Sequence, residues 1–268
     1  MKIDIDNNLI KTGSLLVSDW CVLAVNGEQK KVEEFLQGQL TSDISLICDK
    51  DPQLSSICDH KGLVISDFFV YKQNNEFFII IDKNLMDIFI DELNLFAKFS
   101  SVEFQKLDRK VIGEISEIDS SKGYYLKNDR FQLNVYTKES GFNFESTINL
   151  EQWNAANKIL GVFFLAVEDS LKFRPIEINF DKQRVSFNKG CYRGQEIVAR
   201  MEYLGLNRRK FCTFISKQSF NEHPNIKIIG ETVVLNNSKI FNGIVKRKDL
   251  EEIENTHEII SVSYTHLR

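Results

Sequence analysis

The sequence predicts an α+β fold that ends in a small antiparallel β-barrel. Up to Leu204, apolar runs of strand length are interspersed with segments whose apolar residues recur at helical spacing. Beyond Gly205 the chain changes to short apolar runs separated by Asn, Gly and charged turns, a pattern typical of a small antiparallel barrel or sandwich. We therefore expect two regions, residues 1–204 and 205–268.

The N-terminal region is expected to open with a strand followed by a helix. Residues 20–25 read WCVLAV, a short apolar run that predicts a strand. Val32, Phe35 and Leu36 then fall at helical spacing, and Gly38 is a suitable residue to end that helix.

Two strands and a second helix should follow. Residues 62–71 and 77–81 are apolar runs on either side of the polar turn KQNNE, which predicts a hairpin. Asp82 is placed to cap the next helix, and residues 101–107 return as a strand. The expected apolar side of this helix consists of Leu85, Met86, Phe89, Leu93 and Phe96.

Residues 111–148 look strand-like but irregular, and a third helix should begin after Asn149. Gln152 stands three positions after Asn149, which approximates a capping box, and Gly161 can end the helix. The last residues, YTHLR at 264–268, lack a strand pattern and are assigned no function.

Composition narrows the classes of protein that the chain can represent. It has 268 residues, 43% of them hydrophobic, and 34 basic against 38 acidic side chains give a net charge of -4. No overall field attracts it to nucleic acid or lipid, so we expect neither direct nucleic-acid binding nor membrane association. Without a signal-peptide pattern at the N-terminus, we expect a cytoplasmic protein, and a monomer.

The five cysteines do not have the spacing of a disulfide framework. They are odd in number, widely spaced and include no C-x-x-C pair, so we expect neither disulfides nor a metal site. The cluster at 58–61, CDHK, is better explained as a turn with surface groups. The basic runs at 207–210 and 246–248 could meet a polyglutamate tail or RNA phosphates, but such short runs are more often solvated surface. Neither run has the interleaved aromatic residues of a single-strand binding platform.

One cysteine lies in an unusual setting. Cys191 has Lys189 two positions before it and Arg193 two after it, and a helix can begin at Gly194. Cations and a helix N-terminus both favour a reactive thiolate. The alternative is a small, buried structural thiol.

The segment around this cysteine resembles a known family. Residues 189–196, KGCYRGQE, are similar to the K-G-C-Y-x-G-Q-E signature of the YgfZ family, folate-binding relatives of the glycine-cleavage T-protein. Residues 35–45, FLQGQLTSDIS, look like the family's Q-G-Q-x-T-x-D segment. Residues 58–71 resemble its C-D-x-K-G segment. The resemblance extends from about residue 19 into the C-terminal region.

The resemblance implies an aminomethyltransferase-like fold and a tetrahydrofolate site. Residues 1–204 would form two α/β subdomains around a central channel that holds the folate. Cys191 would supply the reactive thiol, with Lys189 beside it. The folate-site candidates are Trp20, Trp153, Tyr192, Glu177, Gln195 and Glu196.

The sequence is compatible with three functions. The resemblance implies an accessory protein for iron-sulfur cluster biogenesis or repair, whose partners are iron-sulfur enzymes that modify tRNA by methylthiolation. Asp67 aligns with the catalytic aspartate of the T-protein relatives, which keeps an aminomethyltransferase as the alternative. Alternation along the strand leaves open whether Asp67 is buried or points to solvent. The third possibility is a folate sensor without catalytic activity.

Overall fold

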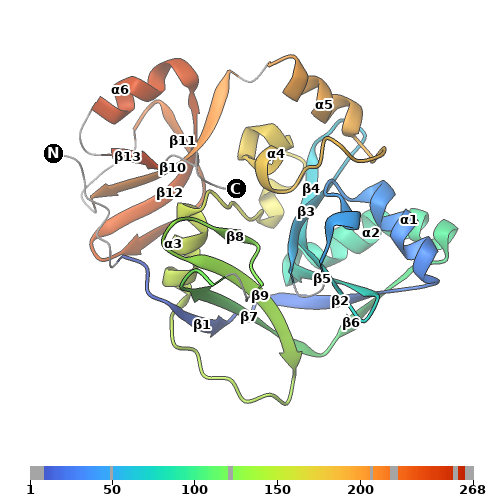
Figure 1. Cartoon of the computed structure of the whole chain (residues 1–268). Coiled ribbons are helices and arrows are strands. Elements are labelled where there is room, and N and C mark those ends of the chain that lie inside the picture. The colour runs from blue at the N-terminus through green and yellow to red at the C-terminus, as the bar shows by residue number, and fades with distance from the viewer. Residues whose placement is uncertain are drawn as a thin grey trace.

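The chain folds into three antiparallel sheets joined by short helices (Figure 1). This computed structural model describes residues 9–48, 51–119, 123–205, 208–217, 223–255 and 259–262. The segment 264–268 and residue 207 of the first basic run lie outside these ranges. Within them, no helix combines the length and apolar character needed to cross a bilayer.

The first sheet has the strand order β3-β4-β5-β2-β6 and is buried on both faces. Its strands are β2 (Trp20–Asn26), β3 (Gln53–Cys58), β4 (Val64–Gln73), β5 (Glu76–Asp82) and β6 (Glu103–Leu107). Successive side chains of a strand point to opposite faces. Leu23 of β2 therefore packs into one core cluster, and its neighbour Val22 into another. Burial on both faces explains why residues 20–25 form a continuous apolar run and confirms the predicted strand.

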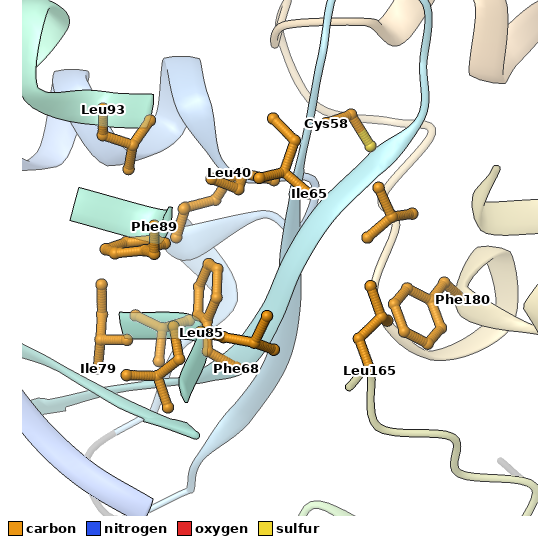
Figure 2. Packing of buried hydrophobic residues seen from close by; sticks show 14 of the residues in the cluster. Leu40, Cys58, Ile65, Phe68, Ile79, Leu85, Phe89, Leu93, Leu165 and Phe180 are labelled. Carbon is orange, nitrogen blue, oxygen red and sulfur yellow. The ribbon is translucent and has the colours of Figure 1, made fainter. Parts of the chain in front are cut away.

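Helices α1 (Gln29–Gln39) and α2 (Lys83–Ser100) cover one face of this sheet. In Figure 2, Leu85 and Phe89 of α2 lie beside Phe68 and Ile79 of the sheet. Asp82 caps α2 as predicted, because its carboxylate accepts a hydrogen bond from the Asn84 N–H at 2.7 Å. Such burial of large apolar side chains is the main term that stabilises the layer.

Two expectations about these helices are wrong. Gly38 does not end α1, which continues to Gln39. The chain leaves the helix at Leu40, whose extended backbone places a fully buried side chain in the core. Phe96 is 41% exposed, so the buried side of α2 ends differently, with Ala97 in the core instead.

The second sheet has the strand order β1-β7-β9-β8, and the third helix packs against it. Its strands are β1 (Gly13–Leu16), β7 (Arg109–Ser116), β8 (Leu126–Lys127) and β9 (Gln132–Glu139). Helix α3 (Leu150–Ile159) begins as predicted: the Asn149 side chain accepts from the Gln152 N–H at 3.0 Å. Gly161, with φ of +72°, lies just beyond its end in the left-handed region that glycine tolerates.

The remaining helical elements are short, and those within residues 167–203 connect this sheet to the C-terminal one. They are η1 (Ile44–Leu46), η2 (Val167–Asp169), η3 (Pro175–Ile178), α4 (Phe180–Gln183), α5 (Gln195–Tyr203), η4 (Arg247–Asp249) and α6 (Leu250–Asn255).

The C-terminal sheet confirms the predicted antiparallel strands. Its order is β11-β12-β10-β13, from β10 (Arg209–Lys217), β11 (Ile226–Leu235), β12 (Ser238–Lys246) and β13 (Ile259–Val262). β11 and β13 are its edges, so the described strands form an open sheet and closure into a barrel is not confirmed. Side chains from this sheet enter both core clusters of the N-terminal region.

Candidate functional site

A cavity of about 830 Å³ lies between α3, residues 162–169 and strand β11. A volume of this size is typical of a small-molecule site. Helix α3 presents one face to it, because the lining positions follow the spacing i, i+3, i+4, i+7 and i+8. The lining residues of α3 are Leu150, Trp153, Asn154, Asn157 and Lys158.

Both tryptophans of the sequence line this cavity, but they do so differently. Trp20 is half-buried, and its ring lies edge-on to Phe164 with the centroids 4.9 Å apart. Trp153 is 2% exposed, and its ring packs so closely on β7 that a Cβ at Gly113 would lie 3.0 Å from it. Trp20 is therefore the more available surface for a flat ligand, and Trp153 is mainly a core residue.

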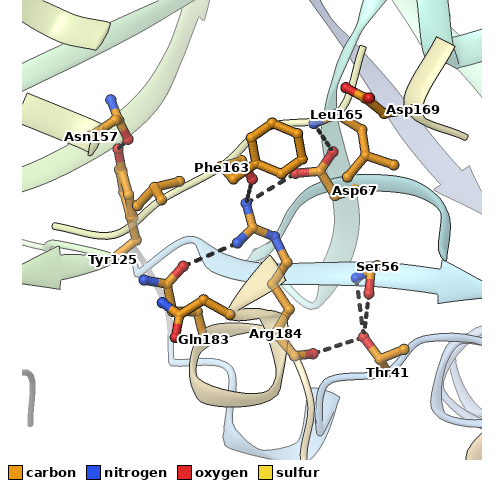
Figure 3. A network of polar contacts seen from close by, with 12 residues as sticks. Thr41, Ser56, Asp67, Tyr125, Asn157, Phe163, Leu165, Asp169, Gln183 and Arg184 are labelled. Atoms are coloured by element: carbon orange, nitrogen blue, oxygen red, sulfur yellow. Dashed lines mark hydrogen bonds and ion pairs between the residues drawn. The ribbon is translucent and has the colours of Figure 1, made fainter. Parts of the chain in front are cut away.

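Asp67 of β4 lies beneath the cavity in a buried ion pair (Figure 3). Its Oδ2 accepts from the Arg184 guanidinium at 2.9 Å, and its Oδ1 accepts from the Leu165 N–H at 3.0 Å. The same guanidinium nitrogen donates to the Phe163 carbonyl at 3.1 Å. Burial raises the pKa of Asp67 to about 6, although Arg184 and the Leu165 N–H act in the opposite direction. Asp67 is thus a buried, paired carboxylate and does not point to solvent.

A small pocket of about 20 Å³ separates Asp67 from the Trp20 ring. Trp20, Asp67, Asp82 and Phe164 all line it, and its volume is about that of one water molecule. Tyr125 forms a separate polar contact nearby: its hydroxyl donates to Asn157 Oδ1 at 2.6 Å (Figure 3). Asn157 also lines the large cavity, so the Tyr125–Asn157 pair borders that cavity.

Cys191 lies elsewhere, on an exposed loop that precedes α5. Lys189 is buried, and its ammonium donates to three backbone carbonyls, those of Gln37 at 2.7 Å, Leu40 at 2.6 Å and Ser42 at 2.9 Å. Its three donors are therefore used to hold the end of α1 rather than to face the thiol. Lys189 is a structural clamp for the loop.

Two glycines close the other side of this loop. Gly194, with φ of +83°, packs directly on Gly62, and a Cβ at position 194 would collide with the Asp59 carbonyl. Helix α5 begins at the next residue, as predicted. Arg193 forms an ion pair with Glu92 of α2, so this cation also has another partner.

The turn at 59–62 is held by Asp59, whose Oδ1 accepts from the Lys61 and Leu63 N–H groups. This confirms the predicted turn, although Cys58 itself is buried rather than a surface group. No group of three potential metal ligands is found within the described ranges.

No protein-family model matches the chain. It is 30% identical over 247 residues to the tRNA-modifying protein YgfZ of Buchnera aphidicola subsp. Schizaphis graminum, covering 80% of this chain and 76% of that protein. The chain belongs to the YgfZ family. The YgfZ protein of Vibrio atlanticus is 29% identical, over 72% of this chain and 67% of that protein.

The chain is also similar to an uncharacterized protein and, in its fold, to a solved structure. An uncharacterized protein of Haemophilus influenzae is 32% identical over 68% of this chain, which spans 66% of that protein's length. The glycine cleavage system aminomethyltransferase T of Bartonella henselae superposes with a TM-score of 0.62 at 14% identity, over 90% of this chain and 80% of that one. This YgfZ-family chain therefore has the α+β fold of the aminomethyltransferases.

In this YgfZ-family chain the candidate residues fall into two places. Trp20 and Trp153 meet at the cavity, with Asp67 beneath it. The residues that line the cavity in the described part of the chain do not include Cys191, Lys189, Tyr192, Glu177, Gln195 or Glu196.

Those residues have other contacts or lie on the surface. Glu177 in η3 accepts from the Arg174 N–H, and Gln195 accepts from the Tyr192 N–H at 3.3 Å. Glu196 is exposed and pairs with Arg200 within α5. The Tyr192 ring is buried, and its hydroxyl has no hydrogen-bond partner among the described residues.

Sequence reasoning missed Arg184, Tyr125, Asn157 and Lys158. Arg184 is separated from Asp67 by 117 positions, and no local pattern pairs them. Asn157 carried a usable signal, because it follows Trp153 by four positions and so shares its helical face.

Proposed function

We propose that this YgfZ-family chain binds tetrahydrofolate in the cavity beside α3 and supports tRNA modification. The observation that carries the proposal is that Trp20 and Trp153, the only tryptophans of the sequence, line one cavity of about 830 Å³. The names of the YgfZ relatives support the link to tRNA modification. The aminomethyltransferase-like fold supports the folate site.

The chemistry of the cavity fits a folate. Trp20 and Phe164 offer apolar ring surfaces, against which a flat pterin can pack. The carboxylates of Asp19, Asp82 and Asp169 also line the cavity and can accept the N–H donors of a pterin. These residues would bind and orient the folate, which supplies one-carbon chemistry when bound.

Cys191 would act at a separate place from the folate. Its thiol is exposed on a loop that Lys189 and Gly194 hold in shape, and it is not among the described residues that line the cavity. A surface thiol can meet a group carried by another macromolecule. We propose that the Cys191 thiol contacts iron-sulfur enzymes or their assembly factors, including the enzymes that methylthiolate tRNA.

An aminomethyltransferase is the second candidate, favoured by the fold of the Bartonella protein. The residue aligned with the catalytic aspartate, Asp67, is 4% exposed and paired with Arg184. A carboxylate held in this way is not free to accept a proton from a ligand in the large cavity. We therefore place this activity second. Robust tetrahydrofolate-dependent aminomethyl cleavage by the purified protein would reverse the order.

Folate binding is tested by anaerobic titration of the purified protein with tetrahydrofolate, followed by tryptophan fluorescence. We expect saturable quenching, and Trp20→Ala should weaken binding by about tenfold or more because it removes the available ring. Trp153 still reports binding in that variant. No saturable change in the wild-type protein, confirmed by calorimetry, would refute the folate site.

The role of the thiol is tested by complementation of a strain that lacks its own YgfZ-family gene, with methylthiolated tRNA as the readout. Cys191→Ala should fold, bind tetrahydrofolate like the wild type and fail to restore the modification. Cys48→Ala is the matched control, because Cys48 is the other exposed cysteine in the described ranges, and it should restore it fully. Full rescue by Cys191→Ala would refute the proposed thiol.

A further inference from the structure

Lys158 is the one buried charged side chain among the described residues that line the cavity. It lies near the C-terminal end of α3 and is 9% exposed. Its backbone is fixed, because the carbonyl accepts from the Thr213 hydroxyl at 2.6 Å and from the Gly161 N–H at 2.9 Å. The position of this cation on the cavity wall is therefore set by α3 and by the C-terminal sheet.

The ammonium of Lys158 has no hydrogen-bond or ion-pair partner within the described part of the chain. Glu231 of β11 is the charged group that acts on it most strongly, but the two form no ion pair. A cation that is largely removed from water without a partner is costly. The cost is offset when a ligand brings an anion to it.

We propose that Lys158 binds a carboxylate of the cavity ligand, namely a carboxylate of the glutamyl end of the folate. This inference rests on the proposed folate site and identifies which end of the ligand lies where. The other cations of the cavity lining in the described ranges, Lys172 and Lys227, are exposed and in water. Lys158 is thus the cation that offers a desolvated and therefore stronger contact.

The geometry of α3 is consistent with an extended ligand. Lys158 follows Trp153 by five residues, which places the two about 7.5 Å apart along the helix axis. Both side chains line the cavity, so a ring near the tryptophans and a carboxylate near Lys158 can belong to one ligand. A single ammonium near a helix C-terminus suits one carboxylate better than a phosphate dianion, which prefers several donors or a helix N-terminus.

The test compares two probes on the full-length protein, tetrahydrofolate and tetrahydropteroate, which lacks the glutamate. We expect the wild type to bind tetrahydrofolate about ten- to a hundredfold more tightly, the range of a charged hydrogen bond. In Lys158→Met this ratio should fall to near one, while Lys158→Arg should keep it. Lys172→Met is the matched control on the same cavity, and its ratio should equal that of the wild type.

Each outcome separates this inference from the folate site itself. A wild type that binds neither probe refutes the folate site. A wild type that binds both probes equally leaves the folate site intact and refutes the role of Lys158, even if Lys158→Met does not fold. The role of Lys158 is also refuted if Lys158→Met leaves the ratio of the two affinities unchanged.

Discussion

At the scale of single residues, the pair of Asp67 and Arg184 shows how the cavity floor is stabilised. Neither side chain has appreciable contact with water, with exposures of 1% and 0% for the two side chains. The guanidinium also lies over the Phe180 ring, 3.9 Å from its centroid. Removing one partner of such a pair leaves a buried charge uncompensated, which costs more than the pair contributes.

Arg184→Met should therefore lower the free energy of unfolding by about 3–5 kcal/mol. The double variant Asp67→Asn with Arg184→Met should recover part of this loss, because the amide is neutral and still accepts from the Leu165 N–H. Urea unfolding of the three proteins measures both values. A double variant less stable than Arg184→Met would contradict the assigned cause.

Lys158 should give the protein a measurable pH dependence of stability. Burial lowers its pKa in the folded chain to about 8, against about 10.4 in an unfolded chain. Between these values the unfolded chain binds the additional proton, so the free energy of unfolding rises with pH. From pH 8 to pH 10, the difference between wild type and Lys158→Met should rise by about 2 kcal/mol.

The charged neighbours on the cavity wall, Asp169, Lys172, Lys227 and Glu231, are present in both proteins, so this difference isolates Lys158. Urea unfolding at several pH values, without ligand, gives the measurement. A difference that does not change with pH would show that the ammonium is hydrated.

At the scale of elements, the loop before α5 is fixed by backbone contacts on both sides. Gly194 combines a left-handed backbone with close packing on the turn at 59–62, whereas a side chain at Gly190 would meet nothing within 4 Å. These two glycines of one motif therefore have different roles. Gly194 closes the loop against the turn at 59–62, and Gly190 leaves the approach to Cys191 open.

Gly194→Ala should destabilise the protein by about 2–4 kcal/mol, because the strained φ and the collision with the Asp59 carbonyl add. Gly190→Ala is the matched control and should change stability by less than about 0.5 kcal/mol. Thermal unfolding of both variants gives the comparison. Equal effects at the two positions would contradict the packing described for this loop.

The sequence was most informative where a local pattern decides the structure. The caps at Asp82 and Asn149 follow from side chains next to their own helices, and both predictions are confirmed. Partners distant in sequence left no such pattern, which is why Lys189 was interpreted as a neighbour of the thiol when it binds carbonyls about 150 positions away. Tyr192, Gln195 and Glu196 of this loop were likewise expected at the folate site, but they do not line the cavity in the described part of the chain, because local sequence does not reveal which elements meet in the fold.

At the scale of the whole molecule, the hydrophobic core crosses the expected boundary at residue 204. Phe211 and Ile244 of the C-terminal sheet pack into one core cluster of the N-terminal region, and Ile215 and Ile240 into the other. The division into residues 1–204 and 205–268 stays a proposal about architecture. Because the two regions share these clusters, we expect them to unfold together.

Asn242→Ala tests this cooperativity. Asn242 is fully buried in β12 and donates to the Val162 carbonyl at 3.1 Å, and its Oδ1 lies 3.0 Å from the Thr213 hydroxyl oxygen. The variant should lose about 2–4 kcal/mol. Both tryptophans lie before residue 204, where they pack in or against a core cluster that the C-terminal sheet shares, so their fluorescence reports the unfolding of the N-terminal region. We expect fluorescence and circular dichroism to shift to the same new midpoint; an unchanged fluorescence midpoint would indicate independent units.

The clamp made by Lys189 also bears on when the thiol loop acquires its shape during synthesis. Its ammonium acceptors belong to residues 37–42, and Gly194 of the same loop packs on residues 59–62. Contacts of such large sequence separation form late in folding, because they require the closure of long loops. We therefore expect a nascent chain to expose Cys191 as an ordinary flexible thiol, and the defined loop to form only when the chain has completed folding.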